Sequence, residues 1–213
     1  ITYLEYKKKI EFGQKEYDEI NKYCKKLKIE WFTSVWDVPS LKFMMKYKPK
    51  FHKVASSMIT NKELLENIAK TKIKTFVSTG MSSMTEIDNA IKIFKRYKCP
   101  IIPMHSVSIY PCPLEKLNLK MINTLKSKYK CSVGYSGHEM NVTPSVQAAI
   151  LGADYIERHI TTDRALWGTD QAASLGPDGI KLLRNLVDKV VLAEGDCKKK
   201  IYDEEGSKLK TMK

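Results

Sequence analysis

The sequence lacks the features of several protein classes. No apolar run reaches the roughly 18–20 residues that a membrane-spanning helix needs. The N-terminus has neither an initiator methionine nor a basic-then-apolar signal segment. The five cysteines are scattered and contain no CxxC pair, which argues against a disulfide framework or a cysteine-ligated zinc site. We therefore expect a cytoplasmic protein without membrane association, whose natural start lies upstream of Ile1.

Acidic residues are in the minority. The chain has 37 Lys and Arg against 24 Asp and Glu, a net charge of +13. Such an excess can indicate nucleic-acid binding, but the lysines form no single stripe with interleaved aromatics. They lie on predicted helix faces such as "NKYCKKLK" and "GDCKKKIY". A generally lysine-rich surface explains the charge best, attraction of an anionic small molecule comes second, and nucleic acid comes last.

The 213 residues repeat one order of elements: a short apolar run, a polar loop and an amphipathic segment. This alternation predicts parallel strands covered by helices. The six apolar runs cover residues 29–37, 52–57, 73–80, 100–108, 131–138 and 154–161. Helices are predicted over 61–70, 83–97, 143–152 and 176–195, with Thr85 as an N-cap and Gly152 as a helix stop.

Two α/β architectures fit this order, a (β/α)8 TIM barrel and a doubly wound open sheet. No GxGxxG follows the first run, which counts against a dinucleotide-binding sheet. Polar residues recur where each run ends, and a barrel gathers all such ends on one face. We therefore predict a barrel. Six units do not close eight strands, so it is predicted to be N-terminally incomplete, with about six βα units here and two strands upstream.

Two histidines end neighbouring runs, His138 in the fifth and His159 in the sixth. Neighbouring parallel strands lie about 4.8 Å apart, so imidazoles at matching heights can share one cation. Two nitrogen ligands with open positions suit Mn, Fe, Co or Zn. The alternative is a pair of partly buried histidines that hydrogen-bond to backbone carbonyls.

Lys53 begins an otherwise apolar run. Core strands rarely carry lysine unless its charge is paired, so an anionic ligand is one interpretation and a lysine reaching out to solvent is the other. Ser56, Ser78, Thr79 and Ser108 have hydroxyls that suit a phosphate or carboxylate, although each is a weak signal alone. Gly80 and Gly134 are expected where the backbone needs space, and His52 and His105 are expected to be structural.

Five motifs together resemble the N-acetylneuraminate (sialic acid) synthase family. They are "HKVASSMITNKELL", "FVSTGMSSMTEID", "HSVSIYPCP", "VGYSGHE" and "IERHITTDRALWGTDQAASLGP", in order and with compatible spacing. The resemblance implies condensation of phosphoenolpyruvate with an N-acetylated amino sugar, N-acetylmannosamine or its 6-phosphate. The products are a nine-carbon acid and phosphate. It also implies a (β/α)8 barrel followed by a small antifreeze-like (SAF) domain, and a homodimer.

The resemblance also implies roles for individual residues. His138 and His159 match the protein ligands of a divalent metal, manganese first, with magnesium and cobalt as alternatives. Lys53, Tyr110 and Asp170 form the implied catalytic set, and Asp170 and Tyr110 face the sugar. The residues that match the phosphoenolpyruvate-binding set are Ser34, Lys53, Ser56, Ser78, Ser108, Tyr110 and Ser136.

Three departures from the family pattern stand out. Met58 occupies a position where several members have Glu or Asp, the first two strands are absent, and the chain stops at "KKKIYDEEGSKLKTMK", which resembles the linker towards the SAF domain. Residues 1–195 are therefore expected to form a partial barrel, with 196–213 as a linker towards an absent SAF domain. Three alternatives remain open. They are a legionaminate or pseudaminate synthase, a synthase of a keto-deoxy sugar acid, and a non-catalytic basic or degenerate member.

Overall fold

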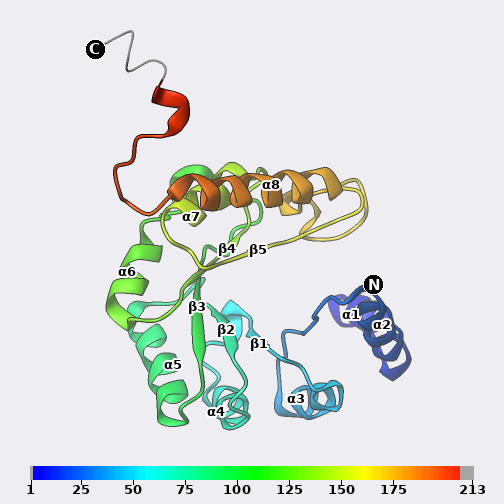
Figure 1. Ribbon diagram of the computed structural model, residues 1–213. Helices are drawn as coiled ribbons and strands as arrows, with labels where there is room; N and C mark the ends of the chain where they lie inside the picture. Colours follow the sequence, from blue (N-terminus) through cyan, green and yellow to red (C-terminus); the bar gives the residue numbers. More distant parts are fainter. Residues whose placement is uncertain (1, 207–213) are drawn as a thin grey trace.

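The computed structural model describes residues 2–206, and its helices and strands alternate along the chain (Figure 1). The α-helices are α1 (Tyr3–Ile10), α2 (Gln14–Leu27), α3 (Val38–Met44), α4 (Lys62–Lys70), α5 (Met84–Arg96), α6 (Met121–Tyr129), α7 (Thr143–Ile150) and α8 (Pro177–Glu194). The strands are β1 (His52–Val54), β2 (Thr75–Ser78), β3 (Ile101–Ser106), β4 (Gly134–Gly137) and β5 (Tyr155–Arg158).

The five strands form one parallel sheet in the order β1-β2-β3-β4-β5. Each strand pairs with the next one along the chain, so the order contains no reversal of the kind that a doubly wound sheet requires. The register places Lys53 beside Phe76, Phe76 beside Ile102, and Gly134 beside Tyr155. A (β/α)8 barrel has its strands side by side in the order of the sequence, so this sheet has the strand order of a barrel.

The sheet is curved, as a contact between its two outer strands shows. Lys53 of β1 and Glu157 of β5 are four strand spacings apart, which is about 19 Å in a flat sheet. Their side chains are instead 2.8 Å apart, between Nζ and Oε1. Only a sheet that curls around its inner face brings them together. The predicted (β/α)8 architecture is therefore present as a half-barrel.

Strand alternation separates two apolar layers. Outward-facing side chains such as Val54 and Val77 join residues of the covering helices, including Leu65 and Phe94, in the larger core. Inward-facing Phe76, Ile102 and Met104 form a smaller cluster inside the curve, against Phe32, Phe51 and Tyr155. The inner cluster lies inside the curve, below the carboxyl ends of the strands.

One predicted strand does not form. Residues 29–37 make only an isolated parallel bridge, between Ser34 and Lys53, so the described part of the sheet has five strands rather than six. Trp31 stacks on Tyr17 of α2 and packs against Tyr47. These contacts hold the start of the run near α2 rather than along β1.

The helix ends follow local chemistry. Ser83, not Thr85, caps α5: its side chain accepts from the backbone N–H of Glu86, whose carboxylate accepts from Ser83 in return. A serine one residue before the helix has the extended backbone that a cap needs, whereas Thr85 already lies within the helix. Helix α7 ends at Ile150, and Gly152 adopts a positive φ of 89°, as expected for a helix stop.

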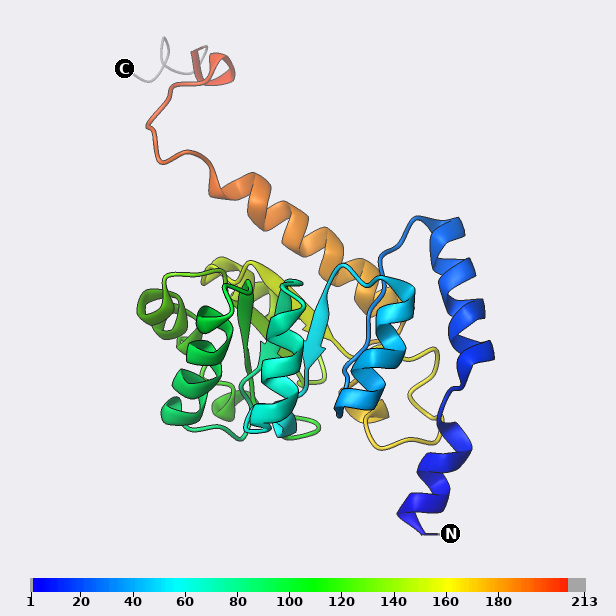
Figure 2. The same cartoon turned by 90° about the horizontal axis from the view of Figure 1, so that it is seen from below.

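Helices α4, α5, α6 and α7 follow one another around the outer face of the curved sheet, and α8 packs beside α7 (Figures 1 and 2). After α8 ends at Glu194, the chain leads away from the sheet (Figure 1). Residues 207–213 of the predicted linker lie outside the described part. Among residues 2–206, no helix is long and apolar enough to cross a membrane.

Candidate active site

A cavity of about 620 Å³ opens above the inner apolar cluster, at the carboxyl ends of the strands. This volume lies within the range of small-molecule sites. All ten residues predicted to form the site line it: Ser34, Lys53, Ser56, Ser78, Ser108, Tyr110, Ser136, His138, His159 and Asp170. They come from loops and strand ends spread over more than 130 positions, and the barrel gathers them as predicted.

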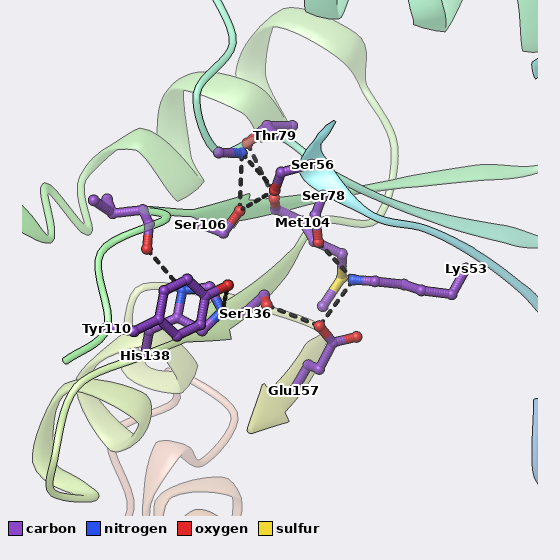
Figure 3. Close-up of polar contacts among 12 residues, drawn as sticks. Lys53, Ser56, Ser78, Thr79, Met104, Ser106, Tyr110, Ser136, His138 and Glu157 are labelled. Carbon is purple, nitrogen blue, oxygen red and sulfur yellow. Dashed lines mark hydrogen bonds and ion pairs between the residues drawn. The ribbon is translucent and has the colours of Figure 1, made fainter. Parts of the chain in front are cut away.

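Lys53 is the charged centre of the cavity floor. Its buried ammonium donates to Ser78 Oγ (2.5 Å) and to Glu157 Oε1 (2.8 Å), and Ser136 Oγ donates to the same Glu157 oxygen (2.8 Å; Figure 3). Burial alone would raise the pKa of Glu157, but the charge of Lys53 and the two hydrogen bonds outweigh it and hold this pKa below its usual value. An ammonium has three donors, so one remains for an anion.

A second group of hydroxyls surrounds the backbone of Gly80. The Gly80 N–H donates to Ser106 Oγ (2.9 Å) and Ser56 Oγ (3.1 Å). A Cβ at position 80 would lie 2.3 Å from Ser108 Oγ and 2.9 Å from Ser56 Oγ. Only glycine therefore allows the hydroxyls to come this close, as predicted for Gly80. Converging hydroxyls beside an ammonium suit an anion with several oxygens.

On the opposite wall, three rings lie together. The ring centroids of His138 and His159 are 5.3 Å apart, and Tyr110 lies 4.2 Å from His138 and 5.6 Å from His159. The Tyr110 hydroxyl is 3.2 Å from His138 Nε2 (Figure 3). Burial raises the pKa of Tyr110, as do the nearby carboxylates of Asp170 and Glu157, so its hydroxyl stays protonated and can donate.

The two imidazoles fit a shared divalent cation. His138 Nδ1 lies 2.7 Å from the carbonyl oxygen of Val107, which fixes the proton on Nδ1 and leaves the Nε2 lone pair facing the cavity. Two imidazoles bound through nitrogens about 2.1 Å from one ion have centroids about 4.5–5.5 Å apart, which matches the observed separation. Within residues 2–206 no three His, Cys, Asp or Glu groups form a metal cluster, so such an ion would take only two ligands from these residues.

Asp170 reaches the cavity from the long loop that follows β5. Its Oδ2 lies 3.7 Å from His159 Nδ1, too long for a hydrogen bond. The loop is held by Arg164, which donates to the carbonyl oxygens of Ser174 (2.8 Å) and Met140 (2.7 Å). Asp170 therefore faces the same space as Tyr110, at the outer end of the cavity.

Two residues of the candidate site, Glu157 and Ser106, were not predicted from the sequence. Glu157 lines the cavity and pairs with Lys53, and Ser106 receives the Gly80 N–H. Strand alternation contained a signal for Glu157, because it lies two residues before His159 and so faces the same side. Thr79 was wrongly grouped with the anion-binding hydroxyls, since its hydroxyl donates to the carbonyl of Met104 instead.

Other expectations about single residues are confirmed. His52 and His105 are buried outside the cavity lining, where His105 Nε2 lies 2.7 Å from the carbonyl oxygen of Leu117. A Cβ at Gly134 would lie 2.2 Å from Met104 Sδ, so glycine is needed there for close packing. Met58, at a position where several family members are expected to have Glu or Asp, is partly buried and packs against the outer core.

Comparison with known proteins gives concordant matches. The NeuB family model matches residues 1–199. N,N'-diacetyllegionaminic acid synthase of Campylobacter jejuni is 34% identical over 92% of this chain and 60% of its own. Human N-acetylneuraminate-9-phosphate synthase is 33% identical over 94% of this chain and 56% of its own. The chain thus spans a little more than half the length of these curated relatives.

A solved structure agrees with the half-barrel. N-acetylneuraminic acid synthetase of Leptospira borgpetersenii, in complex with citrate, is 34% identical and superimposes with a TM-score of 0.87, covering 94% of this chain and 70% of that one. The fold, the gathered motifs and the family model lead to one conclusion: the chain belongs to the NeuB family.

Proposed function

We propose that the protein is a phosphoenolpyruvate-dependent nonulosonic acid synthase, which joins phosphoenolpyruvate to an N-acetylated amino sugar and releases phosphate. The observation that carries the proposal is the division of one cavity into two chemically different walls. Lys53 and the serine hydroxyls form an anion-binding wall, and Tyr110, His138, His159 and Asp170 form a wall for a carbonyl and sugar hydroxyls. Family membership supports the same assignment.

The anion-binding wall suits phosphoenolpyruvate, which carries a phosphate and a carboxylate. The remaining donor of Lys53 and the hydroxyls of Ser56 and Ser108 converge on the same space, and charge-assisted hydrogen bonds there fix the enol. Glu157 keeps the ammonium in place and offsets part of its charge. These groups hold the phosphate in the geometry that it has while its bond to C2 breaks.

The opposite wall suits the open-chain sugar. A divalent cation held by His138 and His159, with manganese as our first choice, would supply Lewis-acid polarisation of the aldehyde oxygen. The Tyr110 hydroxyl lies 3.2 Å from His138 Nε2; with that nitrogen bound to the cation, the hydroxyl is free to donate to a sugar oxygen beside it, and Asp170 accepts from sugar hydroxyls in the same cavity. The sugar is thereby oriented with its aldehyde carbon towards the enol.

The reaction balances with these groups. C3 of phosphoenolpyruvate forms a bond to the aldehyde carbon, and water adds to C2. The C2–O bond to phosphate then breaks as the C2 ketone forms. One proton of the water ends on the former aldehyde oxygen, and the other leaves with phosphate. No oxidant or nucleotide is required.

The test is an assay of the natural full-length protein with phosphoenolpyruvate, Mn²⁺ and a panel of sugars: N-acetylmannosamine, its 6-phosphate and a diacetamido hexose. We expect release of phosphate with one sugar and a product mass equal to the two substrates plus water minus phosphoric acid. The sugar that reacts separates the neuraminate, 9-phosphate and legionaminate types. The absence of phosphate release with every sugar and metal would refute the proposal.

The same proposal includes the expected homodimer, a cytoplasmic location and the division into a barrel (1–195) and a linker (196–213). Its reducing compartment is in keeping with the free thiols of the five cysteines.

A further inference from the structure

A buried ion pair lies directly behind the two candidate metal-binding histidines. Arg158 precedes His159 at the end of β5, and Glu139 follows His138 at the end of β4. Arg158 Nη1 is 2.9 Å from Glu139 Oε1, and the side chains are only 2% and 1% exposed. Because successive side chains of a strand point to opposite faces, the pair lies on the outer side of the strands whose inner side carries the imidazoles.

The ion pair is part of a network that reaches the backbone. Besides Glu139, Arg158 Nη1 donates to the carbonyl oxygen of Asn141 (2.9 Å) and to Ser145 Oγ (3.0 Å), and Nη2 donates to the carbonyl oxygen of Glu139. Tyr135 donates to Glu139 Oε2 (2.8 Å), and Ser145 donates to Oε1 (2.9 Å). The guanidinium thus ties β5 to the turn after β4 at three oxygens of two residues.

This arrangement needs an explanation other than stability. A buried ion pair gains little over apolar residues of similar volume, because desolvation of both charges offsets their attraction. Here the cost includes Arg158 Nε, which is buried without a hydrogen-bond partner among the described residues. Gly137 also leaves room for the carboxylate, since a Cβ there would lie 2.6 Å from Glu139 Oε2. We therefore expect the ion pair to fix the relative positions of the ends of β4 and β5 rather than to add stability.

We propose that the Arg158–Glu139 pair positions His138 and His159 relative to each other, so that the two imidazoles present their nitrogens to one cation. This inference rests on the proposed function, since it concerns the cation site of that function. His138 has a second anchor, the Val107 carbonyl, whereas His159 Nδ1 lies 3.7 Å from its nearest ion-pair partner. The position of His159 therefore depends more on the Arg158–Glu139 pair than the position of His138 does.

The test replaces both charges together, because removing one would leave the other buried and unpaired, which strongly destabilises a fold. In the double variant Arg158→Met/Glu139→Gln, the amide oxygen accepts from one of the Tyr135 and Ser145 hydroxyls and the amide NH2 donates to the other, and the methionine fills the space of the guanidinium. A second variant, Arg158→Lys, keeps the charge but loses the paired contacts to Glu139 and Asn141. The matched control is Asp88→Asn/Lys128→Gln, which removes an ion pair of 2.8 Å between α5 and α6.

Two readouts are measured on protein that is shown to be folded by circular dichroism. The first is the ¹⁵N spectrum of the imidazoles without metal, which reports the tautomer and environment of each ring. The second is Mn²⁺ affinity, followed by the electron paramagnetic resonance of the free ion. Outer partners of metal ligands change metal affinity about 10–100-fold, and we expect a loss of this size in the double variant and in Arg158→Lys. The control variant keeps wild-type values.

The outcomes separate the two proposals. Folded variants with unchanged imidazole signals and unchanged Mn²⁺ affinity would overturn the positioning role. Wild-type protein that binds no Mn²⁺ would instead overturn the cation site of the proposed function. The metal-free imidazole spectra would then test the positioning role of the Arg158–Glu139 pair by themselves. A changed His159 signal in the variants supports this role, and an unchanged signal refutes it. If the double variant does not fold, Arg158→Lys provides the same comparison.

Discussion

His52 makes the stability of the protein depend on pH in a way that can be calculated. Its side chain is buried behind β1, 2% exposed, with Nε2 3.2 Å from Thr71 Oγ1. The Thr71 hydroxyl donates to the carbonyl oxygen of Ile68 (2.7 Å), so it accepts from the imidazole. The imidazole therefore carries a proton on Nε2. Burial lowers the pKa of His52 from 6.5 to about 4 in the folded state.

The direction of the pH dependence follows from how many protons His52 binds in the folded and in the unfolded state. Above pH 6.5 neither state is protonated, and His52 contributes no pH dependence. As the pH falls from 6.5 to 4, the unfolded chain binds a proton that the folded protein does not, so the free energy of unfolding decreases. With 1.36 kcal/mol per pH unit, the loss reaches about 2.5 kcal/mol at pH 4.5. Below pH 4 both states are protonated and the loss stops growing.

The assay is urea unfolding, followed by tryptophan fluorescence, at several values between pH 7.5 and pH 4.5. Because carboxylates also titrate, the wild type is compared with His52→Gln, whose amide still donates to Thr71 and does not titrate. We expect the variant to gain about 2.5 kcal/mol relative to the wild type between these two values. Thr71→Val is the control: it loses the hydrogen bond at every pH but keeps the wild-type slope. An equal slope in His52→Gln would refute the reasoning.

Three further predictions concern the cavity. His138→Ala and His159→Ala each abolish Mn²⁺ binding and lower turnover at least about 10³-fold, with circular dichroism unchanged; turnover near the wild-type value in both would remove the proposed metal role. Lys53→Met raises KM for phosphoenolpyruvate about 10–100-fold, since a charge-assisted hydrogen bond contributes about 1.5–3 kcal/mol; steady-state kinetics that show an unchanged KM would contradict this. Gly80→Ala raises the same KM, because its methyl group would lie 2.3 Å from Ser108 Oγ, whereas KM for the sugar stays near the wild-type value; titration of each substrate separates the two effects.

The fold was predictable where the pattern is local. The alternation of apolar runs and amphipathic segments predicted all five strands and the helices α4, α5, α7 and α8, because burial on both faces of a parallel sheet selects continuous apolar runs. Helix α6 was not predicted. The prediction failed at residues 29–37, where the same apolar composition forms only a bridge at Ser34. There the aromatic contacts of Trp31 with Tyr17 and Tyr47 compete with strand pairing, and periodicity does not reveal which of them wins.

The sequence by itself determined which side chains reach the cavity. His138, His159 and several of the serines follow from their place at the ends of runs, because parallel strands of a barrel bring their carboxyl ends to one face. Lys53 begins its run, and the family resemblance rather than its place in the run indicated its role. Only the tertiary structure decided how these side chains pair. Lys53 meets Glu157 across 104 positions because the sheet curls, and Arg158 meets Glu139 because two strand ends lie side by side. Curvature and side-chain packing sum many distant contacts, which no local stretch of sequence contains.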